Sequence, residues 1–171
     1  MMSRFLKTIS IALGLVALVA VAPGFAQNHT IPYRNARFGY KLELPPAMLV
    51  VNRASDGSGV TWQTGSFRIL VSGVNNPYAI KPHEYYEKIQ ELAKGRVVEE
   101  SEGNIDGGHS GYWHQILYTK DSRRVHQKTF IAGQAINIIE VSYPYRLRKQ
   151  KESVAQRILD SFQPGSLTEL H

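Results

Sequence analysis

The chain has 171 residues, of which 43% are hydrophobic and 20% are charged, as is ordinary for a single globular domain. It contains no cysteine, so disulfides, thiol catalysis and thiolate metal sites are excluded. Its formal net charge of +6 comes from 20 Lys and Arg against 14 Asp and Glu, and without Arg4 and Lys7 of the predicted leader it is +4. A charge this mild does not indicate nucleic-acid binding.

Residues 1–26 have the pattern of a secretory signal peptide. Arg4 and Lys7 form its positively charged start, and an apolar run from Ile9 to Ala22 follows. This run is shorter than the roughly 20 residues of a transmembrane anchor, and small residues precede a cleavage site near Ala26. We therefore expect residues 27–171 to form one exported domain, periplasmic or secreted, with a bacterial envelope as the favoured setting. A retained N-terminal anchor is the alternative.

Strands are predicted in the first half of the exported part. The clearest is Arg37–Leu44, in which apolar and polar side chains alternate until two prolines end the run. Further strands are predicted at Met48–Val51, Val60–Gln63 and Phe67–Val71.

A helix is predicted at Pro82–Lys94, because proline suits the first turn of a helix and Gly95 follows its end. A short strand is predicted at Arg96–Glu99, and a glycine-rich loop is predicted from Ser101 to Gly111.

The stretch from Arg123 to Tyr143 predicts a central antiparallel hairpin. Its two runs are rich in β-branched and aromatic residues and meet at Gly133-Gln134, a common two-residue hairpin turn. The preceding strand, Tyr112–Lys120, joins the hairpin through Asp121-Ser122.

Two-residue turns would place His114 and His126 on opposite faces of the sheet. The face that carries His114 is the more apolar, but the other face also holds many apolar residues. A sheet with one wet face alternates more cleanly, so we expect a helix on each face, the second at about Lys149–Phe162. The predicted fold class is α+β: an antiparallel β-sheet of about six strands packed between two helices.

Four segments carry a family resemblance: FGYKLELP early in the domain, IDGG at residues 105–108, IIEVSYP at the end of the hairpin, and ILDSF in the last helix. Their order over residues 31–162 resembles the PsbP-like family, including bacterial envelope members related to DcrB. The resemblance implies an α/β/α sandwich and a binding or assembly role rather than an enzymatic one. No ion-binding motif is matched, so the resemblance implies no site residue and no cofactor.

The sequence lacks the motifs of common enzymes. The segment from Gly107 to Gly111 comes nearest to a serine-hydrolase elbow, but its spacing is wrong and a strand follows it. The sequence has neither a glycine-rich phosphate loop nor paired histidines on a helix face. We therefore expect a protein that is not an enzyme.

Three histidines, His109, His114 and His126, raise zinc binding as an alternative, because neutral imidazole is a good ligand. Ligand-spacing signatures are absent, so we interpret them as ordinary strand and loop histidines and predict no metal site. The acidic segment Glu99–Glu102, with Asp106, is interpreted as a solvated bend, because it lacks the alternate spacing of a calcium-binding loop.

The clearest charge feature is a basic run at the start of the final helix. Its residues are Arg146, Arg148, Lys149 and Lys151. A solvated helix start is the first interpretation. The functional alternative is a weak contact with an anionic membrane or polymer, with Tyr143 and Tyr145 beside it as an amphipathic edge. Arg123 and Arg124 belong to the other end of their hairpin arm, so they need not join this run.

These features favour a non-catalytic, exported envelope domain that binds a protein partner or acts as an assembly accessory. The alternative is a small-ligand or lipid-binding domain with a pocket between sheet and helix. Trp62, Tyr78, Tyr85 and Tyr86 are candidates to line such a pocket, although aromatic residues on helix faces more often belong to the core.

Overall fold

The computed structural model describes residues 29–80, 84–85, 87, 96–104 and 111–165. The predicted signal peptide and the turn at residues 105–108 lie outside these residues. So does most of the helix predicted at Pro82–Lys94, although Glu84, Tyr85 and Glu87 are described and are helical. Within the described ranges, no helix is long and apolar enough to cross a bilayer.

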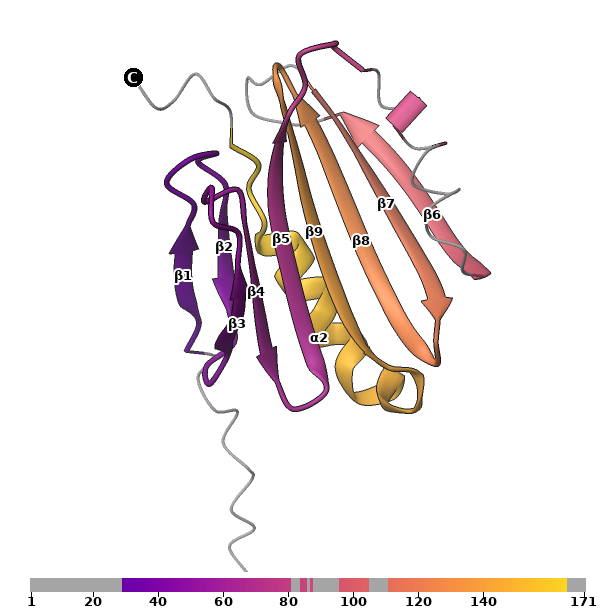
Figure 1. Ribbon diagram of the computed structural model, residues 1–171. Coiled ribbons are helices and arrows are strands. Elements are labelled where there is room, and N and C mark those ends of the chain that lie inside the picture. Colours follow the sequence, from indigo (N-terminus) through magenta and orange to yellow (C-terminus); the bar gives the residue numbers. More distant parts are fainter. Residues whose placement is uncertain (1–28, 81–83, 86, 88–95, 105–110, 166–171) are drawn as a thin grey trace, which may run out of the picture.

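The main element is a seven-stranded antiparallel sheet with the order β3-β4-β5-β9-β8-β7-β6 (Figure 1). Its strands are β3 (Leu49–Arg53), β4 (Gly59–Thr64), β5 (Phe67–Asn75), β6 (Arg96–Asn104), β7 (Gly111–Lys120), β8 (Arg123–Ala132) and β9 (Ala135–Pro144). The antiparallel prediction is confirmed, but the sheet has one strand more than the six expected. β6 also runs on into the predicted loop, because β7 pairs with it as far as Asn104 opposite Tyr112.

A separate two-stranded sheet consists of β1 (Ile31–Arg34) and β2 (Lys41–Leu44). The sequence did not predict β1, which contains Pro32, a residue tolerated at a sheet edge. Asn35 holds the turn between these strands: its Oδ1 accepts from the backbone N–H groups of Arg37 (2.9 Å) and Phe38 (2.7 Å). Only Lys41–Leu44 of the long predicted first strand is therefore extended and paired, because its first half forms this turn.

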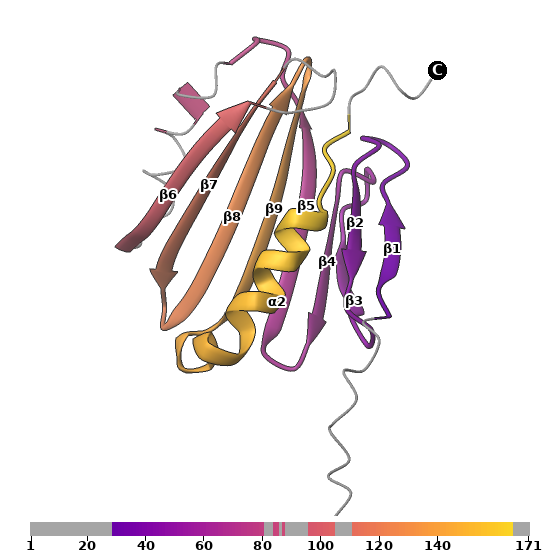
Figure 2. The same ribbon diagram turned by 180° about the vertical axis from the view of Figure 1, so that it is seen from behind.

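A helix, α2 (Arg148–Ser161), follows a short 3-10 turn, η1 (Tyr145–Leu147), and lies across one face of the sheet, here called the back face (Figure 2). The β1–β2 pair extends the same layer over β3 and β4. The main core fills the space between this layer and the sheet. Its largest members include Phe38, Tyr40, Leu42, Trp62, Phe67, Ile69, Phe130, Ile139, Tyr143, Ile158, Leu159 and Phe162.

The expected helix is thus present on the back face, whereas the helix expected on the front face falls mostly outside the described residues. A smaller buried cluster, Ile116, Tyr118 and Val125, marks the front face. The main core lies on the face predicted to be less apolar, because β1–β2 and α2 bring large side chains to it from outside the hairpins.

The predicted hairpin register is confirmed. Lys120 pairs with Arg123 and Ala132 pairs with Ala135, so each turn has two residues. Gly133 has φ +56°, and the non-glycine residues Asp121 and Ser122 also have positive φ, +50° and +60°. Turns of this kind match the twist of the flanking strands, and glycine adopts them most easily.

Candidate functional site

Among the described residues, no helix covers the back face of β7 and β6, because α2 packs chiefly against β9, β2 and β8 (Figure 2). Two concave sites lie along this strip. The larger, the basic-end groove, has a volume of about 660 Å³ and is lined by Val97, Val98, Thr119, Lys120, Asp121, Ser122, Arg124 and Tyr145. The smaller, the polar cavity, has a volume of about 60 Å³ and is lined by Glu99, Glu100, Ser101, Gln115, Leu117, His126, Glu152 and Gln156.

A hydrogen-bonded group, here called the Tyr143 cluster, joins the wall of the polar cavity to α2. The hydroxyl of Tyr143 donates to Glu152 Oε2 at 2.8 Å, and Arg124 Nη2 donates to Glu152 Oε1 at 3.2 Å. His126 Nε2 lies 2.9 Å from the Tyr143 hydroxyl. Because the single hydroxyl proton goes to Glu152, His126 is the donor in that contact.

The surroundings set the charge state of the Tyr143 cluster. Burial lowers the pKa of His126, opposed by Glu152 and reinforced by Arg124. Burial and the neighbouring Glu152 raise the pKa of Tyr143. Burial alone would raise the pKa of Glu152, but hydrogen bonds from Tyr143 and Arg124 and the nearby charges bring it below its ordinary value. At neutral pH the cluster therefore holds a neutral His, a neutral Tyr and a carboxylate, which together fasten α2 to the sheet.

Cationic residues of several elements lie at the end of the sheet that holds the β4–β5 and β7–β8 turns and η1, which is the lower end in Figure 1 and is here called the basic end. Its cations are Arg68, Lys120, Arg123, Arg146, Arg148, Lys149 and Lys151. Hydrogen bonds fix the backbone there: Arg123 Nη2 donates to Ser66 O at 2.9 Å, and Tyr145 N donates to Ser122 O at 2.8 Å. The guanidinium of Arg148 stacks over the Tyr145 ring at 4.7 Å.

The four predicted contact residues thus lie at one end of the molecule. Arg146 and Lys149 are exposed, whereas Arg148 and Lys151 are half-buried. Sequence reasoning left Arg123 outside this group, yet Arg123 pairs with Pro144 and lies beside η1. The two-residue turn at Gly133-Gln134 was the signal that could have placed it there, because that turn fixes the register of β8 against β9.

The predicted amphipathic edge is half right. Tyr145 is 41% exposed, but Tyr143 is fully buried in the Tyr143 cluster. Trp62 and Tyr78 do not line one pocket as the alternative required, because Trp62 is buried in the core whereas Tyr78 is exposed, and Tyr86 lies outside the described residues. Tyr85 is half-buried.

The histidines are not brought together. His114 and His126 lie on opposite faces, as their register predicted, and His114 Nε2 contacts Glu100 Oε1 at 3.3 Å. His109 and Asp106 lie outside the described residues. In the part of the chain that is described, no group of three or more His, Asp or Glu side chains could hold a metal ion. The acidic segment Glu99–Glu102 is exposed as expected but forms part of β6, not a bend.

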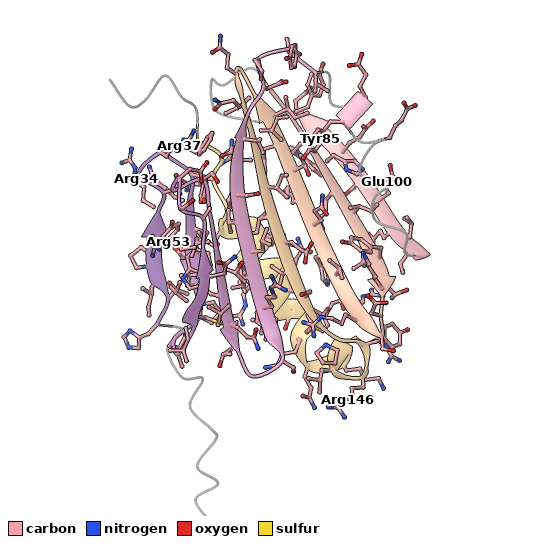
Figure 3. All side chains as sticks on the ribbon, in the orientation of Figure 1. Arg34, Arg37, Arg53, Tyr85, Glu100 and Arg146 are labelled. Atoms are coloured by element: carbon pink, nitrogen blue, oxygen red, sulfur yellow. The ribbon has the colours of Figure 1, made fainter. Side chains whose placement is uncertain are left out.

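The two edge strands of the main sheet differ in chemistry. Leu49, Val50 and Val51 of β3 are 69%, 50% and 55% exposed. The opposite edge strand, β6, carries the exposed glutamates of the acidic segment. Figure 3 shows the same contrast in charge, with Arg34 and Arg53 on the β3 side and Glu100 on the β6 side. Sequence reasoning identified β3 but could not show that it would be an edge.

No protein-family model matches the sequence, and a search of curated proteins gives no match. The fold is similar to the solution structure of cyanobacterial PsbP (CyanoP) from Synechocystis sp. PCC 6803, with a TM-score of 0.62 and 12% identity. That match covers 85% of this chain and 98% of CyanoP.

The crystal structure of LpqN, involved in cell envelope biogenesis of Mycobacterium tuberculosis, superposes less well, with a TM-score of 0.47. Its sequence is 16% identical, and the match covers 80% of this chain and 91% of LpqN. A Pseudomonas aeruginosa protein of unknown function gives a TM-score of 0.45 and 13% identity over 80% of this chain and 97% of that protein.

Proposed function

Starting from its PsbP-like fold, we propose that the chain is a non-catalytic, exported envelope domain that binds a protein partner through the edge of β3. The observation that carries this proposal is the exposed apolar edge, Leu49–Val51. The predicted signal peptide supports export, and the resemblance to DcrB-related envelope members supports a setting in a bacterial envelope.

An exposed, apolar edge strand invites pairing with another chain, and natural proteins normally protect such edges with charges, prolines or bulges. β6 follows that rule with three glutamates and a bulge between Val97 and Glu99. β3 also has a bulge, between Val50 and Asn52, but its first three residues carry no charge. The difference between the two edges supports β3 as a surface kept open for a partner.

The occupant that best fits this edge is an extended segment of another protein, added to the sheet as an eighth strand. Backbone hydrogen bonds would supply affinity, and the alternating side chains of β3 would supply specificity. Arg53 at the end of β3 and Arg34 on the same side of the molecule favour acidic residues beside the apolar ones in that segment (Figure 3).

The test is photo-crosslinking in the native envelope, with the crosslinking amino acid p-benzoylphenylalanine placed at Val50. A matched control carries it at Val98, which is equally exposed on the opposite edge, 49% against 50%. We expect one discrete protein adduct from Val50 and none from Val98. The substitution Val51→Lys should abolish the adduct without lowering the melting temperature, because this side chain packs little. Equal adducts from both edges, or an adduct that survives Val51→Lys, would refute the proposal.

The basic-end groove favours a second candidate function, the binding of a small ligand or lipid. Its volume of about 660 Å³ lies within the range of ligand pockets, roughly 300–1,000 Å³. Its lining combines Val97, Val98 and Tyr145 with the cations Lys120 and Arg124. Native mass spectrometry of protein purified gently from its envelope tests this candidate: a small molecule that co-purifies and is lost on substitution of Arg124 would support it, and an unliganded mass would contradict it.

A further inference from the structure

The cations of the basic end come from three separate parts of the chain and meet only through folding. Arg68 is the second residue of β5, Lys120 and Arg123 flank the β7–β8 turn, and Arg146 lies in η1, which runs directly into α2. The register aligns these parts, since Arg68 pairs with Ser142 and Arg123 pairs with Pro144. Figure 3 shows Arg146 at the extreme lower end of the molecule. The charge therefore covers a broad end surface and not a single helix face.

Carboxylates neutralise only part of this charge. Among the described residues of this end, the carboxylates are Asp121, Glu140 and Glu152, fewer than the cations. Glu152 already accepts a hydrogen bond from Arg124 and another from Tyr143. The first turn of α2 carries Arg148, Lys149 and Lys151 and no acidic residue. These cations lie at the positive end of the helix dipole and therefore do not stabilise the helix.

Apolar surface accompanies the charge. Tyr145 is 41% exposed beside the β7–β8 turn, and Val98 is 49% exposed in the wall of the groove that Tyr145 also lines. A tyrosine with an apolar ring and a polar tip suits a membrane–water interface, where long cationic side chains also extend their charges towards head groups.

We propose that the basic end docks the protein on an anionic phospholipid surface, with Tyr145 at the depth of the head groups. The broad distribution of cations fits a flat layer of phosphates better than a single bound segment of protein. Each cation near an anionic membrane strengthens binding about five-fold, so individually weak contacts combine. The inference does not depend on the β3 edge, which lies on a side of the sheet and not at its end.

The test measures co-sedimentation of the purified mature protein with vesicles of phosphatidylcholine, alone or mixed with phosphatidylglycerol. We expect binding only to the mixed vesicles. Binding should fall steeply when the ionic strength rises from about 0.1 M to about 1 M, because the Debye length shortens from about 10 Å to about 3 Å. Binding that is the same on both vesicle types, or that resists salt, would overturn the proposal.

A pair of triple variants with equal net charge then separates position from total charge. The first, Lys120→Gln/Arg146→Gln/Lys149→Gln, removes three exposed cations of the basic end. It should weaken vesicle binding about 100-fold, at about five-fold per cation. The second, with the three substitutions Arg34→Gln, Lys41→Gln and Arg157→Gln, removes exposed cations elsewhere and should bind nearly as well as the wild type. Equal losses would show that only net charge matters and would refute the assigned surface.

The orientation is tested by the variant Tyr145→Trp with lipids brominated on their acyl chains. Its fluorescence should be quenched on mixed vesicles, whereas the wild-type protein, with Trp62 buried in the core and Trp113 half-buried on β7, should be quenched far less. Poly-glutamate, an acidic polymer without a bilayer, serves as the competing partner. Tight binding to poly-glutamate without binding to vesicles would replace the membrane by an acidic protein and overturn the proposal.

Discussion

The substitution Tyr143→Phe tests whether the Tyr143 cluster holds α2 to the sheet. It removes one oxygen atom and keeps the ring, which stacks on Phe67 at 5.9 Å with an interplanar angle of 9°. The lost hydroxyl is the bridge between His126 on β8 and Glu152 on α2. We expect a clear loss of stability with an unchanged fold.

The magnitude follows from the groups left behind. The hydrogen bond to the Glu152 carboxylate contributes about 1.5–3 kcal/mol, and a buried donor left without an acceptor costs about 1–3 kcal/mol. After the substitution, Glu152 Oε1 lies 3.6 Å from His126 Nε2, too far for a good hydrogen bond. Glu152 is 41% exposed, so water replaces part of its lost contact. We therefore expect a loss of about 2–3 kcal/mol, which corresponds to a fall of about 4–12 °C in melting temperature for a domain of this size.

Urea denaturation measures this loss, and Tyr118→Phe provides the matched control. Tyr118 is also buried, 6% exposed, but its hydroxyl makes no hydrogen bond with the described residues, so its removal should change stability by less than about 0.5 kcal/mol. A double-mutant cycle with Glu152→Gln should give a coupling energy of about 1 kcal/mol. Additive effects, or equal losses for the two tyrosines, would show that the cluster does not join the helix to the sheet.

Three further predictions follow from the surroundings of single groups. Burial lowers the pKa of His126 below its ordinary 6.5, so on acidification the unfolded chain takes up a proton before the folded one. The free energy of unfolding should therefore fall as the pH drops below about 6.5. Urea denaturation at a series of pH values measures this fall, and His126→Gln should make it smaller. The lowered pKa of Glu152 adds a loss only at more acidic pH, below about 4.5. Burial raises the pKa of Glu140 despite nearby cations, so Glu140→Gln should raise the melting temperature at pH 7, and this gain should vanish below about pH 4.5. Ser122 has φ +60°, a conformation that costs a residue with a side chain about 1–2 kcal/mol. Glycine avoids this cost but loses about 0.5–1 kcal/mol more conformational entropy on folding. Ser122→Gly should therefore stabilise the protein by about 0.5 kcal/mol, as measured by urea denaturation.

The hairpins were predictable because their information is local. Two-residue turns at Asp121-Ser122 and Gly133-Gln134 fix the pairing of three strands, and the period of two then assigns every side chain to a face. The same reasoning correctly separated His114 from His126. The last helix was also predictable, within a residue at each end, because its apolar residues recur at helical spacing.

The rest depended on contacts between distant segments. β1 contains a proline and gains its pairing only from β2, so no local pattern announces it. The polarity of the hairpin faces did not reveal the main core, because Phe38, Tyr40 and the apolar side of α2 complete it. The basic end was predicted only in part for the same reason, since Arg68 joins it through the pairing of β5 with β9, two strands far apart in the chain.

The two proposed surfaces are compatible because of how the strands run. The strands of the main sheet extend from the basic end to the opposite end, so a protein resting on its basic end holds them roughly along the membrane normal (Figure 1). β3 then lies at the side of the molecule, where a partner strand can pair with it without displacing the cations from the membrane. The glutamates of β6 would be repelled by an anionic surface, which disfavours docking on that edge. A partner held at the same membrane would also meet β3 at a high effective concentration, so an edge of modest intrinsic affinity would suffice.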